Sequence, residues 1–243
     1  MVYKKHFIPL ESNPGLFTQL IHQLGVSTAL CFHDVWSLDD PSLLSLVPRP
    51  VLAFIIVFPT SSDYEDRLAK GSDVTVDDAL LHRKNKDVIW FKQTINNACG
   101  LYGILHAVAN GRARDFILPG SHLSHLLEKC ASLSPDDCAA VLENDVELES
   151  KYTTVAVLGD TEAPENPEDE VDFHYVCFVK SHHGNNLFLL DGDRHGPVDK
   201  GLLTEDDLLS RQGISTIKEF IDHHDNTGNF SLLALAPSAD PVT

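Results

Sequence analysis

The longest apolar run in the chain, VLAFIIVF at residues 51–58, places the strongest limit on the fold. A helix needs about 20 apolar residues to cross a bilayer, so this run is far too short to span a membrane. It follows the turn-like sequence VPRP at 47–50, and a short apolar run bounded by such signals predicts a buried strand. The rest of the chain must therefore supply elements that cover it.

Periodicity and capping residues predict helices mainly in the first part of the chain. Asn13 supplies a cap, Pro14 the first helical position and Gly25 the end of one helix. Further helices are expected at 42–47, 99–109, 121–130, 134–145, 205–211 (capped by Thr204) and 215–224. Strands rich in apolar, β-branched and aromatic residues are expected at 152–158, 173–180, 186–191 and 230–236. Together these predict an α+β fold with a mostly antiparallel sheet, on which the helix at 99–109 packs.

The charge balance limits the class of partner. Eighteen Lys and Arg residues against 36 Asp and Glu give a formal net charge of -18, which argues against nucleic acid or a membrane surface and favours a basic partner. The first residues, MVYKKHFIPLES, lack the apolar core of a secretory signal. Five cysteines, an odd number, indicate free thiols in a reducing compartment. We expect a cytoplasmic protein, with the nucleus as a second location.

One of the cysteines has a position suited to chemistry. Cys99 falls in the first turn of the helix predicted at 99–109, where unpaired amides and the helix dipole stabilise a thiolate, the nucleophilic form. Gln93, six residues earlier, can donate a carboxamide N–H to the oxyanion that forms when a thiolate attacks a carbonyl. The other four cysteines are interpreted as small core residues: Cys31, Cys130, Cys138 and Cys177.

A base for the thiol can come from the predicted strands. His174 begins one strand and Asp191 ends the next, so an antiparallel pair would bring imidazole and carboxylate together as in a catalytic triad. The alternatives are a core histidine and a turn aspartate. The pairs His182-His183 and His223-His224 lack the spaced partners of a zinc site, so we expect no metal there.

An acidic segment, GDTEAPENPEDEVD at 159–172, separates two of the predicted strands. It carries seven carboxylates and no basic residue. Its composition is typical of a solvated loop, whereas its position inside a compact domain favours a functional loop.

Three segments in this order, KQTINNACGLYGILHAVANG, VDFHYVCFV and LFLLDG, resemble the signature segments of the ubiquitin C-terminal hydrolases, cysteine deubiquitinases with a papain-like core. The similarity extends from FIPLESNP through VPRPV to the terminal FSLLALA. It implies a single catalytic domain over residues 1–243, of the short form without a helical C-terminal extension. The implied architecture is a central, mostly antiparallel sheet flanked by helices, with a crossover loop at the active site.

The resemblance also implies a role for each candidate residue. Cys99 would attack the carbonyl of ubiquitin's terminal glycine and form a thioester, with His174 as general base and acid. Asp191 would orient His174, and Gln93 with the Cys99 amide would form the oxyanion hole. No metal or organic cofactor is implied.

Substrate contacts follow from the same resemblance. The acidic segment would cross the cleft and limit the leaving group to small adducts or short peptides, while its carboxylates suit the basic tail of ubiquitin or a close relative. Each residue could equally be an ordinary surface residue, and a monomer is expected. The candidate contacts are Glu11, Asp34, Asp160, Glu162, Glu165 and Phe230.

Two other functions fit parts of the sequence. A ubiquitin-binding module with little turnover would share the fold, although the complete set of Gln93, Cys99, His174 and Asp191 weighs against it. A different papain-like acyl-transfer enzyme, such as an acetyltransferase, would share the Cys-His-Asp order. It would not account for the acidic segment or for FIPLESNP and VPRPV.

Overall fold

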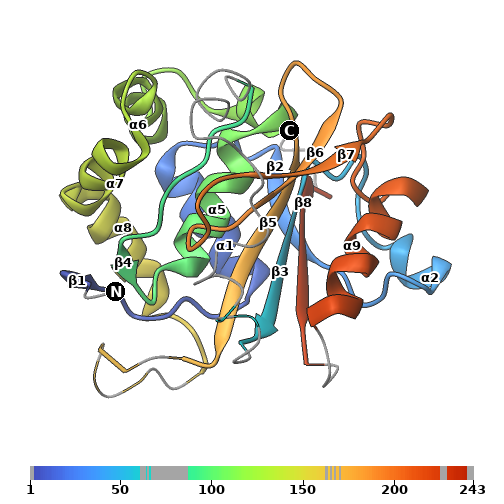
Figure 1. The fold of residues 1–243 in the computed structure, drawn as a ribbon, viewed down its shortest axis with the longest axis horizontal. Coiled ribbons are helices and arrows are strands. Elements are labelled where there is room, and N and C mark those ends of the chain that lie inside the picture. The colour runs from blue at the N-terminus through green and yellow to red at the C-terminus, as the bar shows by residue number, and fades with distance from the viewer. Residues whose placement is uncertain are drawn as a thin grey trace.

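The computed structural model describes residues 3–60, 64, 66, 87–161, 164, 166, 168–169, 171–224 and 229–239. Within these residues, helices pack on both sides of a central sheet (Figure 1). The strands are β1 (Lys5–His6), β2 (Leu30–Asp34), β3 (Ala53–Pro59), β4 (Ile95–Asn96), β5 (Phe173–Lys180), β6 (Asn186–Leu190), β7 (Val198–Leu202) and β8 (Ser231–Pro237). The helices are α1 (Pro14–Leu24), α2 (Pro41–Leu44), α5 (Cys99–Ala109), the 3-10 helix η1 (Gly111–Phe116), α6 (His122–Cys130), α7 (Pro135–Glu143), α8 (Val146–Ala156) and α9 (Arg211–His224).

The main sheet has the strand order β2-β8-β3-β5-β6-β7, and every neighbouring pair in it is antiparallel. The expected α+β class and antiparallel sheet are therefore confirmed. The apolar run at 51–58 supplies β3, which lies between β8 and β5. A separate parallel pair joins β1 to β4, just before α5.

Alternate residues of β3 face two hydrophobic cores. Ile55 and Val57 belong to the core shared with α1 and α5, whereas Phe54, Ile56 and Phe58 belong to the core shared with α9. The two sides are visible in Figure 1, where α9 and α2 lie opposite α1, α5, α6, α7 and α8. Both faces of the strand are buried, which is why its sequence is apolar throughout rather than alternating. In the described part of the chain, no helix is both long and apolar enough to traverse a membrane.

The strand expected at 152–158 is wrong, because residues 152–156 form the end of helix α8 and residues 157–158 form the turn after it. The β-branched residues of segment 152–158 favour a strand when propensity alone is considered. Asp145 caps the helix by accepting the Leu148 N–H at 2.9 Å, and Leu148, Tyr152 and Val155 recur at helical spacing and are buried. Packing of this face against α1 outweighs the local preference. The acidic segment thus follows a helix, not a strand.

The helix expected at 205–211 is also wrong. Residues 205–210 form turns, and α9 begins only at Arg211. The segment is instead tied to the start of β3: Asp207 accepts the Val51 N–H at 3.1 Å, and the Leu208 N–H donates to the Val51 carbonyl at 3.0 Å. The other expected helices and strands are present, with ends that differ by a few residues.

Asn110, the C-cap of α5, joins this helix to the segment that precedes the active site. It is 1% exposed, accepts the Ile89 N–H at 2.6 Å, and donates to the carbonyls of Ile89 and His106 at 2.8 and 2.9 Å. Because each buried partner left unsatisfied costs about 1–3 kcal/mol, we expect Asn110→Ala to lower the free energy of unfolding by about 2–4 kcal/mol, measured by urea denaturation.

Asn144→Ala is the matched control. Asn144 is also a helix C-cap that donates to the carbonyl four residues back, Ala140, at 2.7 Å, but it is exposed. Its loss should cost less than about 1 kcal/mol. Equal losses in both variants would show that burial of Asn110 does not determine its contribution.

Candidate active site

Cys99 occupies the first position of α5, in the buried layer beside β5. All eleven residues of α5 are buried, and Cys99 itself is 7% exposed. The preceding Asn97 has a positive φ of 57°. Ala98, the N-cap residue, makes no side-chain hydrogen bond to the positive end of the helix. The thiol therefore lies in the first turn, where backbone N–H groups have no acceptor within the helix.

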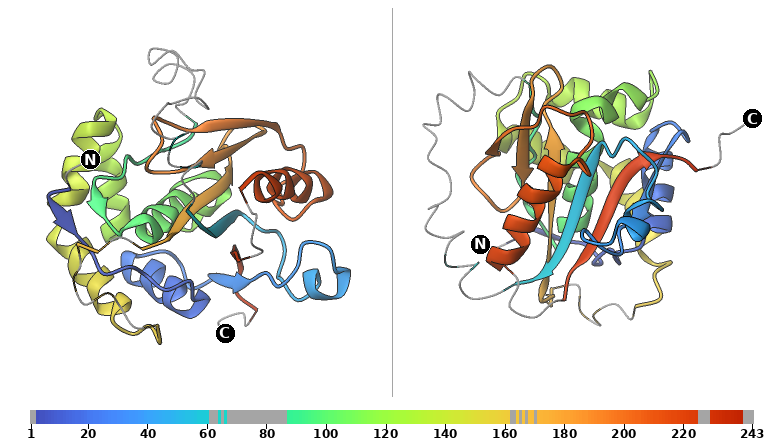
Figure 2. Two further views of the ribbon diagram at one scale, coloured as in Figure 1. Left: turned by 60° about the horizontal axis from the view of Figure 1, so that its bottom comes forward. Right: turned by 90° about the vertical axis from the view of Figure 1, so that its right-hand side faces the viewer.

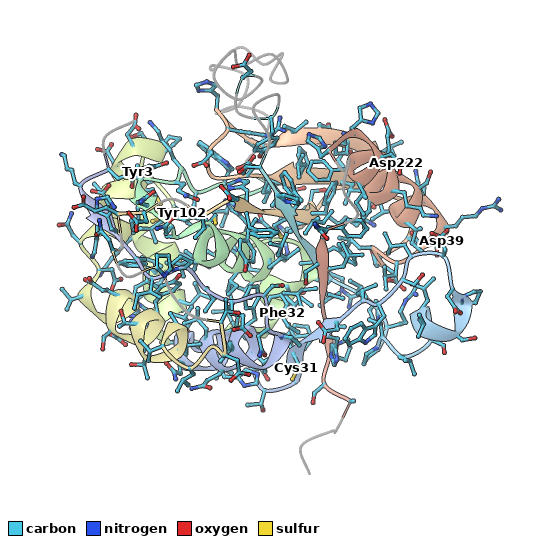
Figure 3. The ribbon with its side chains drawn as sticks, turned by 90° about the horizontal axis from the view of Figure 1, so that it is seen from below. Tyr3, Cys31, Phe32, Asp39, Tyr102 and Asp222 are labelled. Atoms are coloured by element: carbon cyan, nitrogen blue, oxygen red, sulfur yellow. The ribbon has the colours of Figure 1, made fainter. Side chains whose placement is uncertain are left out.

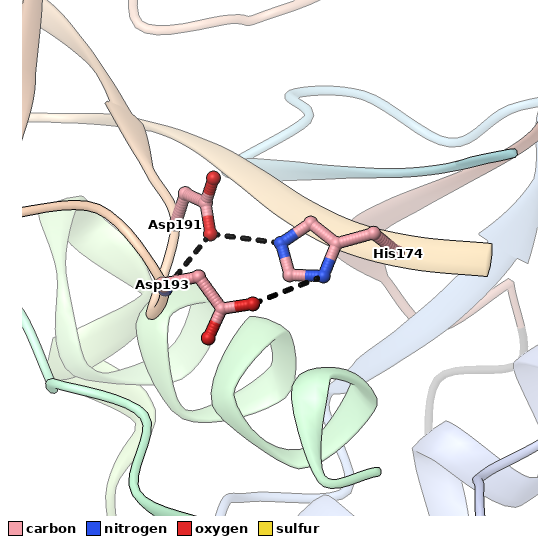
Figure 4. Close-up of side chains that lie close together, drawn as sticks. All are labelled: His174, Asp191 and Asp193. Atoms are coloured by element: carbon pink, nitrogen blue, oxygen red, sulfur yellow. Dashed lines mark hydrogen bonds and ion pairs between the residues drawn. The ribbon is translucent and has the colours of Figure 1, made fainter. Parts of the chain in front are cut away.

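Antiparallel pairing of β5 with β6 brings His174 to Asp191. The ring Nε2 of His174 donates to Asp191 Oδ1 at 2.8 Å (Figure 4). The Cys99 side chain lies close enough to the His174 ring to help raise the pKa of the imidazole. Thiol, imidazole and carboxylate from three distant segments thus come together, and the imidazole and the carboxylate are hydrogen-bonded.

Asp191 is fully buried, and two side chains that sequence reasoning missed hold its second oxygen. Tyr64 donates its O–H to Oδ2, and Arg194 Nε donates to the same oxygen at 3.2 Å. Burial opposes ionisation, but the charge and hydrogen bond of His174, with these donors, lower the pKa of Asp191 below its ordinary range. Arg194 lies three residues from Asp191, so DGDRHG carried a local signal; Tyr64 is 127 residues away in the chain and gave none.

The environment also determines the charge on His174. Burial favours the neutral ring, but the negative charge of Asp191, the hydrogen bond to Asp191 and the nearby Cys99 side chain outweigh it and raise the pKa of His174 well above its usual value. A second carboxylate missed from the sequence, Asp193, lies with Oδ2 3.7 Å from Nδ1 (Figure 4). Burial raises the pKa of Asp193 to about 6, with Asp191 adding to the effect and His174 opposing it.

Gln93 is fixed by the loop that carries Asp191. The Gln93 N–H donates to the Gly192 carbonyl at 2.8 Å, and Trp90 Nε1–H donates to the Asp191 carbonyl at 2.8 Å. Gln93 is 6% exposed, and its Oε1 has no hydrogen-bond partner among the described residues. A Cβ on Gly192 would lie 2.7 Å from Gln93 Cβ, so only glycine allows this approach.

The acidic segment is anchored at one end close in sequence to Cys99. Near its start, the Thr161 N–H donates to Glu11 Oε2 at 2.7 Å, a bond that lowers the pKa of Glu11. Near the end of the segment, the Asp169 carbonyl accepts a hydrogen bond from Asn97 Nδ2 at 2.8 Å. Asn97 lies two residues before Cys99 in the sequence. Of the predicted contacts in this segment, Asp160 is exposed, whereas Glu162 and Glu165 lie outside the described residues.

The remaining predicted contacts, Asp34 and Phe230, line one groove of about 460 Å³. Trp36, 71% exposed and not identified from the sequence, lies on the same groove. Asp39 and Asp222 also line it, and Figure 3 shows both on the same outer side of the molecule. The groove thus combines apolar rings with carboxylates, and burial raises the pKa of Asp34.

The other cysteines and histidine pairs lie elsewhere. Cys138 and Cys177 are buried as expected, while Cys31 and Cys130 are partly exposed, and all five thiols are free. His223 and His224 each bond a helical carbonyl through Nδ1.

Comparisons with known proteins identify the family to which the chain is similar. A family model described as ubiquitin carboxyl-terminal hydrolase, family 1, matches residues 7–222. The chain is similar to ubiquitin carboxyl-terminal hydrolase 3 of Arabidopsis thaliana, with 34% identity over 96% of this chain and 94% of that protein. It is 35% identical to a ubiquitin carboxyl-terminal hydrolase of Drosophila melanogaster (93% and 96% covered) and 31% identical to the human isozyme L1 (95% and 98% covered).

A solved structure shows the same fold. The Trichinella spiralis UCH37 catalytic domain, bound to ubiquitin vinyl methyl ester, matches with a TM-score of 0.74 over 97% of this chain and 98% of that one. The sequence identity is 24%.

His106, buried in α5, makes the segment that leads to Gln93 sensitive to acid. Its Nε2 accepts the Phe91 N–H at 2.9 Å, and burial lowers the pKa of the ring to about 4. The unfolded chain therefore binds this proton more readily, so stability falls as the pH decreases from about 6.5 toward 4. From pH 7 to pH 4.5, we expect His106 to account for about 2 kcal/mol of lost unfolding free energy.

Urea denaturation at the two pH values measures this loss. His106→Gln should show a drop about 2 kcal/mol smaller than the unmodified protein, because glutamine does not titrate. His125→Gln, an exposed histidine on α6, should keep the full drop. The same acid sensitivity in all three proteins would exclude His106 as its source.

Proposed function

The chain belongs to family 1 of the ubiquitin carboxyl-terminal hydrolases, and we infer from this that it is a thiol-dependent hydrolase acting at the C-terminus of ubiquitin. The observation that carries the inference is the row Cys99, His174 and Asp191: Asp191 accepts the Nε2–H of His174 at 2.8 Å, and the Cys99 side chain lies close enough to the same ring to influence its pKa. Such a row supplies a nucleophile, a proton carrier and an orienting charge for acyl transfer.

The reaction begins with transfer of the Cys99 proton to His174 Nδ1. The thiolate attacks the carbonyl carbon of ubiquitin's last glycine, and the Gln93 carboxamide with the Cys99 backbone N–H stabilises the resulting oxyanion. His174 then gives its proton to the departing amine, which leaves a thioester on Cys99. Water, deprotonated by the same ring, hydrolyses the thioester and restores the thiol.

Asp191 orients the ring throughout this cycle. Its bond to Nε2 leaves Nδ1 facing the sulfur, and its charge stabilises the imidazolium formed in each proton transfer. Donors from Tyr64 and Arg194 occupy the other carboxylate oxygen, so Asp191 stays ionised while His174 changes charge.

The acidic segment favours small leaving groups. Its ties to Glu11 and Asn97 support a course across the entrance to Cys99, with the substrate tail passing beneath it. A segment that crosses the entrance in this way admits small adducts and short peptide extensions more readily than folded proteins. Its carboxylates, Asp160 among them, suit the basic tail of ubiquitin or a close relative.

The groove of Asp34, Trp36 and Phe230 fits the globular part of ubiquitin. Exposed aromatic rings next to carboxylates supply the apolar anchor and the polar rim of a protein interface. This groove and the active site would then hold one ubiquitin on one copy of the chain, so a monomer suffices.

Cys99→Ala tests the reaction. With ubiquitin bearing a fluorogenic C-terminal amide, we expect kcat to fall by at least ~10⁴-fold, because removal of a triad nucleophile costs about that or more. Binding of ubiquitin should persist, and Cys31→Ala, at a partly exposed cysteine of β2, should keep full activity. A wild-type chain that binds ubiquitin but releases no product would be a binding module instead.

The same assay measures the effect of leaving-group size. Ubiquitin joined to a folded protein should be cleaved more slowly than the small fluorogenic adduct. Equal rates would contradict the proposal that the acidic segment limits the size of the leaving group. They would not contradict the proposed hydrolase activity.

Gly192→Ala tests the placement of Gln93. The added methyl would lie 2.7 Å from Gln93 Cβ and 3.3 Å from its backbone nitrogen, so it displaces the oxyanion donor. Loss of such a donor typically lowers kcat by about 10²–10³-fold, and we expect about 10²-fold with little change in KM. In Gly103→Ala, the matched control on α5, the methyl meets atoms no closer than 3.7 Å and should leave kcat within about twofold. Unchanged kcat in Gly192→Ala would remove Gln93 from the proposed oxyanion hole.

A further inference from the structure

We propose that Asp193 selects substrates whose leaving group carries a positive charge near the departing amine, such as a diamine or a peptide extension that begins with a basic residue. The proposal rests on the proposed function and concerns the Nδ1 side of the His174 ring. Asp193 Oδ2 lies 3.7 Å from Nδ1, whereas Asp191 Oδ1 accepts the Nε2–H at 2.8 Å. Figure 4 shows the two carboxylates at different nitrogens of the same ring.

The leaving group must come close to Nδ1 of His174. Asp191 holds Nε2, so Nδ1 is the ring nitrogen left to pass a proton to the departing amine. As the C–N bond breaks, that proton moves to the amine nitrogen and the acyl group stays on the sulfur of Cys99. The proton passes along a hydrogen bond of about 3 Å, so the amine lies no more than about 7 Å from Asp193 Oδ2, from whichever side it approaches.

The Asp193 carboxylate is accessible to such a cation. Its side chain is 28% exposed, and among the described residues it has no ion-pair partner apart from the His174 ring. Its backbone is fixed, because the Asp193 N–H donates to Asp191 Oδ1 at 3.0 Å. A carboxylate on a fixed backbone can pair with a ligand at little ordering cost.

Asp191 is not available for this contact. It is fully buried, and its oxygens accept hydrogen bonds from His174, Tyr64 and Arg194. The Arg194 guanidinium is paired with Asp191, so its charge does not cancel that of Asp193. Burial, together with the charge of Asp191, raises the pKa of Asp193 to about 6, so the Asp193 carboxylate is ionised at pH 8.

The size of the preference follows from the distance between the charges. Opposite unit charges about 5 Å apart in water attract each other enough to change an equilibrium about fourfold, and more where water is excluded. A cation on the leaving group meets Asp193 both in the bound substrate and in the transition state, so the contact raises kcat/KM. A neutral leaving group of the same shape gains nothing.

Two ubiquitin amides that differ in one group test the proposal. One carries 1,4-diaminobutane on the terminal glycine and the other carries n-pentylamine, in which a methyl group replaces the ammonium. Release of free ubiquitin at pH 8, followed by mass spectrometry, gives kcat/KM for each amide. We expect the unmodified chain to prefer the cationic amide at least ~4-fold.

Variants assign this preference to Asp193. Asp193→Asn should lower it to less than ~2-fold, while Asp193→Glu, which keeps the charge, should retain it. Glu205→Gln, which removes an exposed carboxylate elsewhere and changes the net charge equally, should also retain it. A merely structural defect in Asp193→Asn would slow both amides equally and leave their ratio unchanged.

Binding separates this proposal from the proposed function. In the Cys99→Ala background, where neither amide is cleaved, titration calorimetry should show at least ~4-fold tighter binding of the cationic amide, and adding Asp193→Asn should abolish the difference. Such a difference in binding, without turnover by the unmodified chain, would support the role of Asp193 and refute the hydrolase. Equal kcat/KM for the two amides, an unchanged preference in Asp193→Asn, or binding of neither amide would overturn the proposal.

Discussion

The buried charge of Asp191 is the constraint on which the site depends. A carboxylate removed from water is costly unless partners satisfy it, and here it has a cation-forming ring, a phenol and a guanidinium. Those partners come from β5, from residue 64 and from the loop after β6. The antiparallel pairing of β5 with β6 is therefore as much a part of the chemistry as the side chains are, because a shift of register by one residue would turn His174 to the other face of the sheet.

Cys99 and Gln93, the proposed nucleophile and the proposed oxyanion donor, are positioned by different means. Cys99 is positioned by a helix whose whole surface is buried against the sheet, and its rigidity follows from packing. Gln93 lies in an extended segment held by hydrogen bonds to His106 of α5 and to Gly192 of the Asp191 loop. The one loop after β6 thus positions both Asp191 and Gln93. The proposed catalytic geometry depends on backbone carbonyls and a buried neutral histidine as well as on Cys99, His174 and Asp191.

Sequence reasoning succeeded where the signal is local and failed where packing decides. The caps at Asn13 and Ser134, the apolar run of β3 and the positions of Cys99, His174 and Asp191 all follow from short patterns. The residues 152–158 were misassigned because β-branching outweighed a helical spacing of buried residues that only the contact with α1 reveals. Tyr64 and Trp36 were missed for a related reason: no periodicity marks a phenol that meets a carboxylate 127 positions away, or an indole left exposed beside a groove.

Two aspartates separated by one glycine show how environment divides the work of identical groups. Asp191 is saturated by donors and stays ionised, so its oxygens cannot leave His174 for another partner. Asp193 lies beside the other ring nitrogen, Nδ1, and its side chain is partly exposed. Burial and the negative charge of Asp191 both raise the pKa of Asp193. The two nitrogens of one imidazole thus meet carboxylates of different character: Asp191 fixes the ring through Nε2, and Asp193 lies beside Nδ1, the nitrogen that the proposed proton transfer uses.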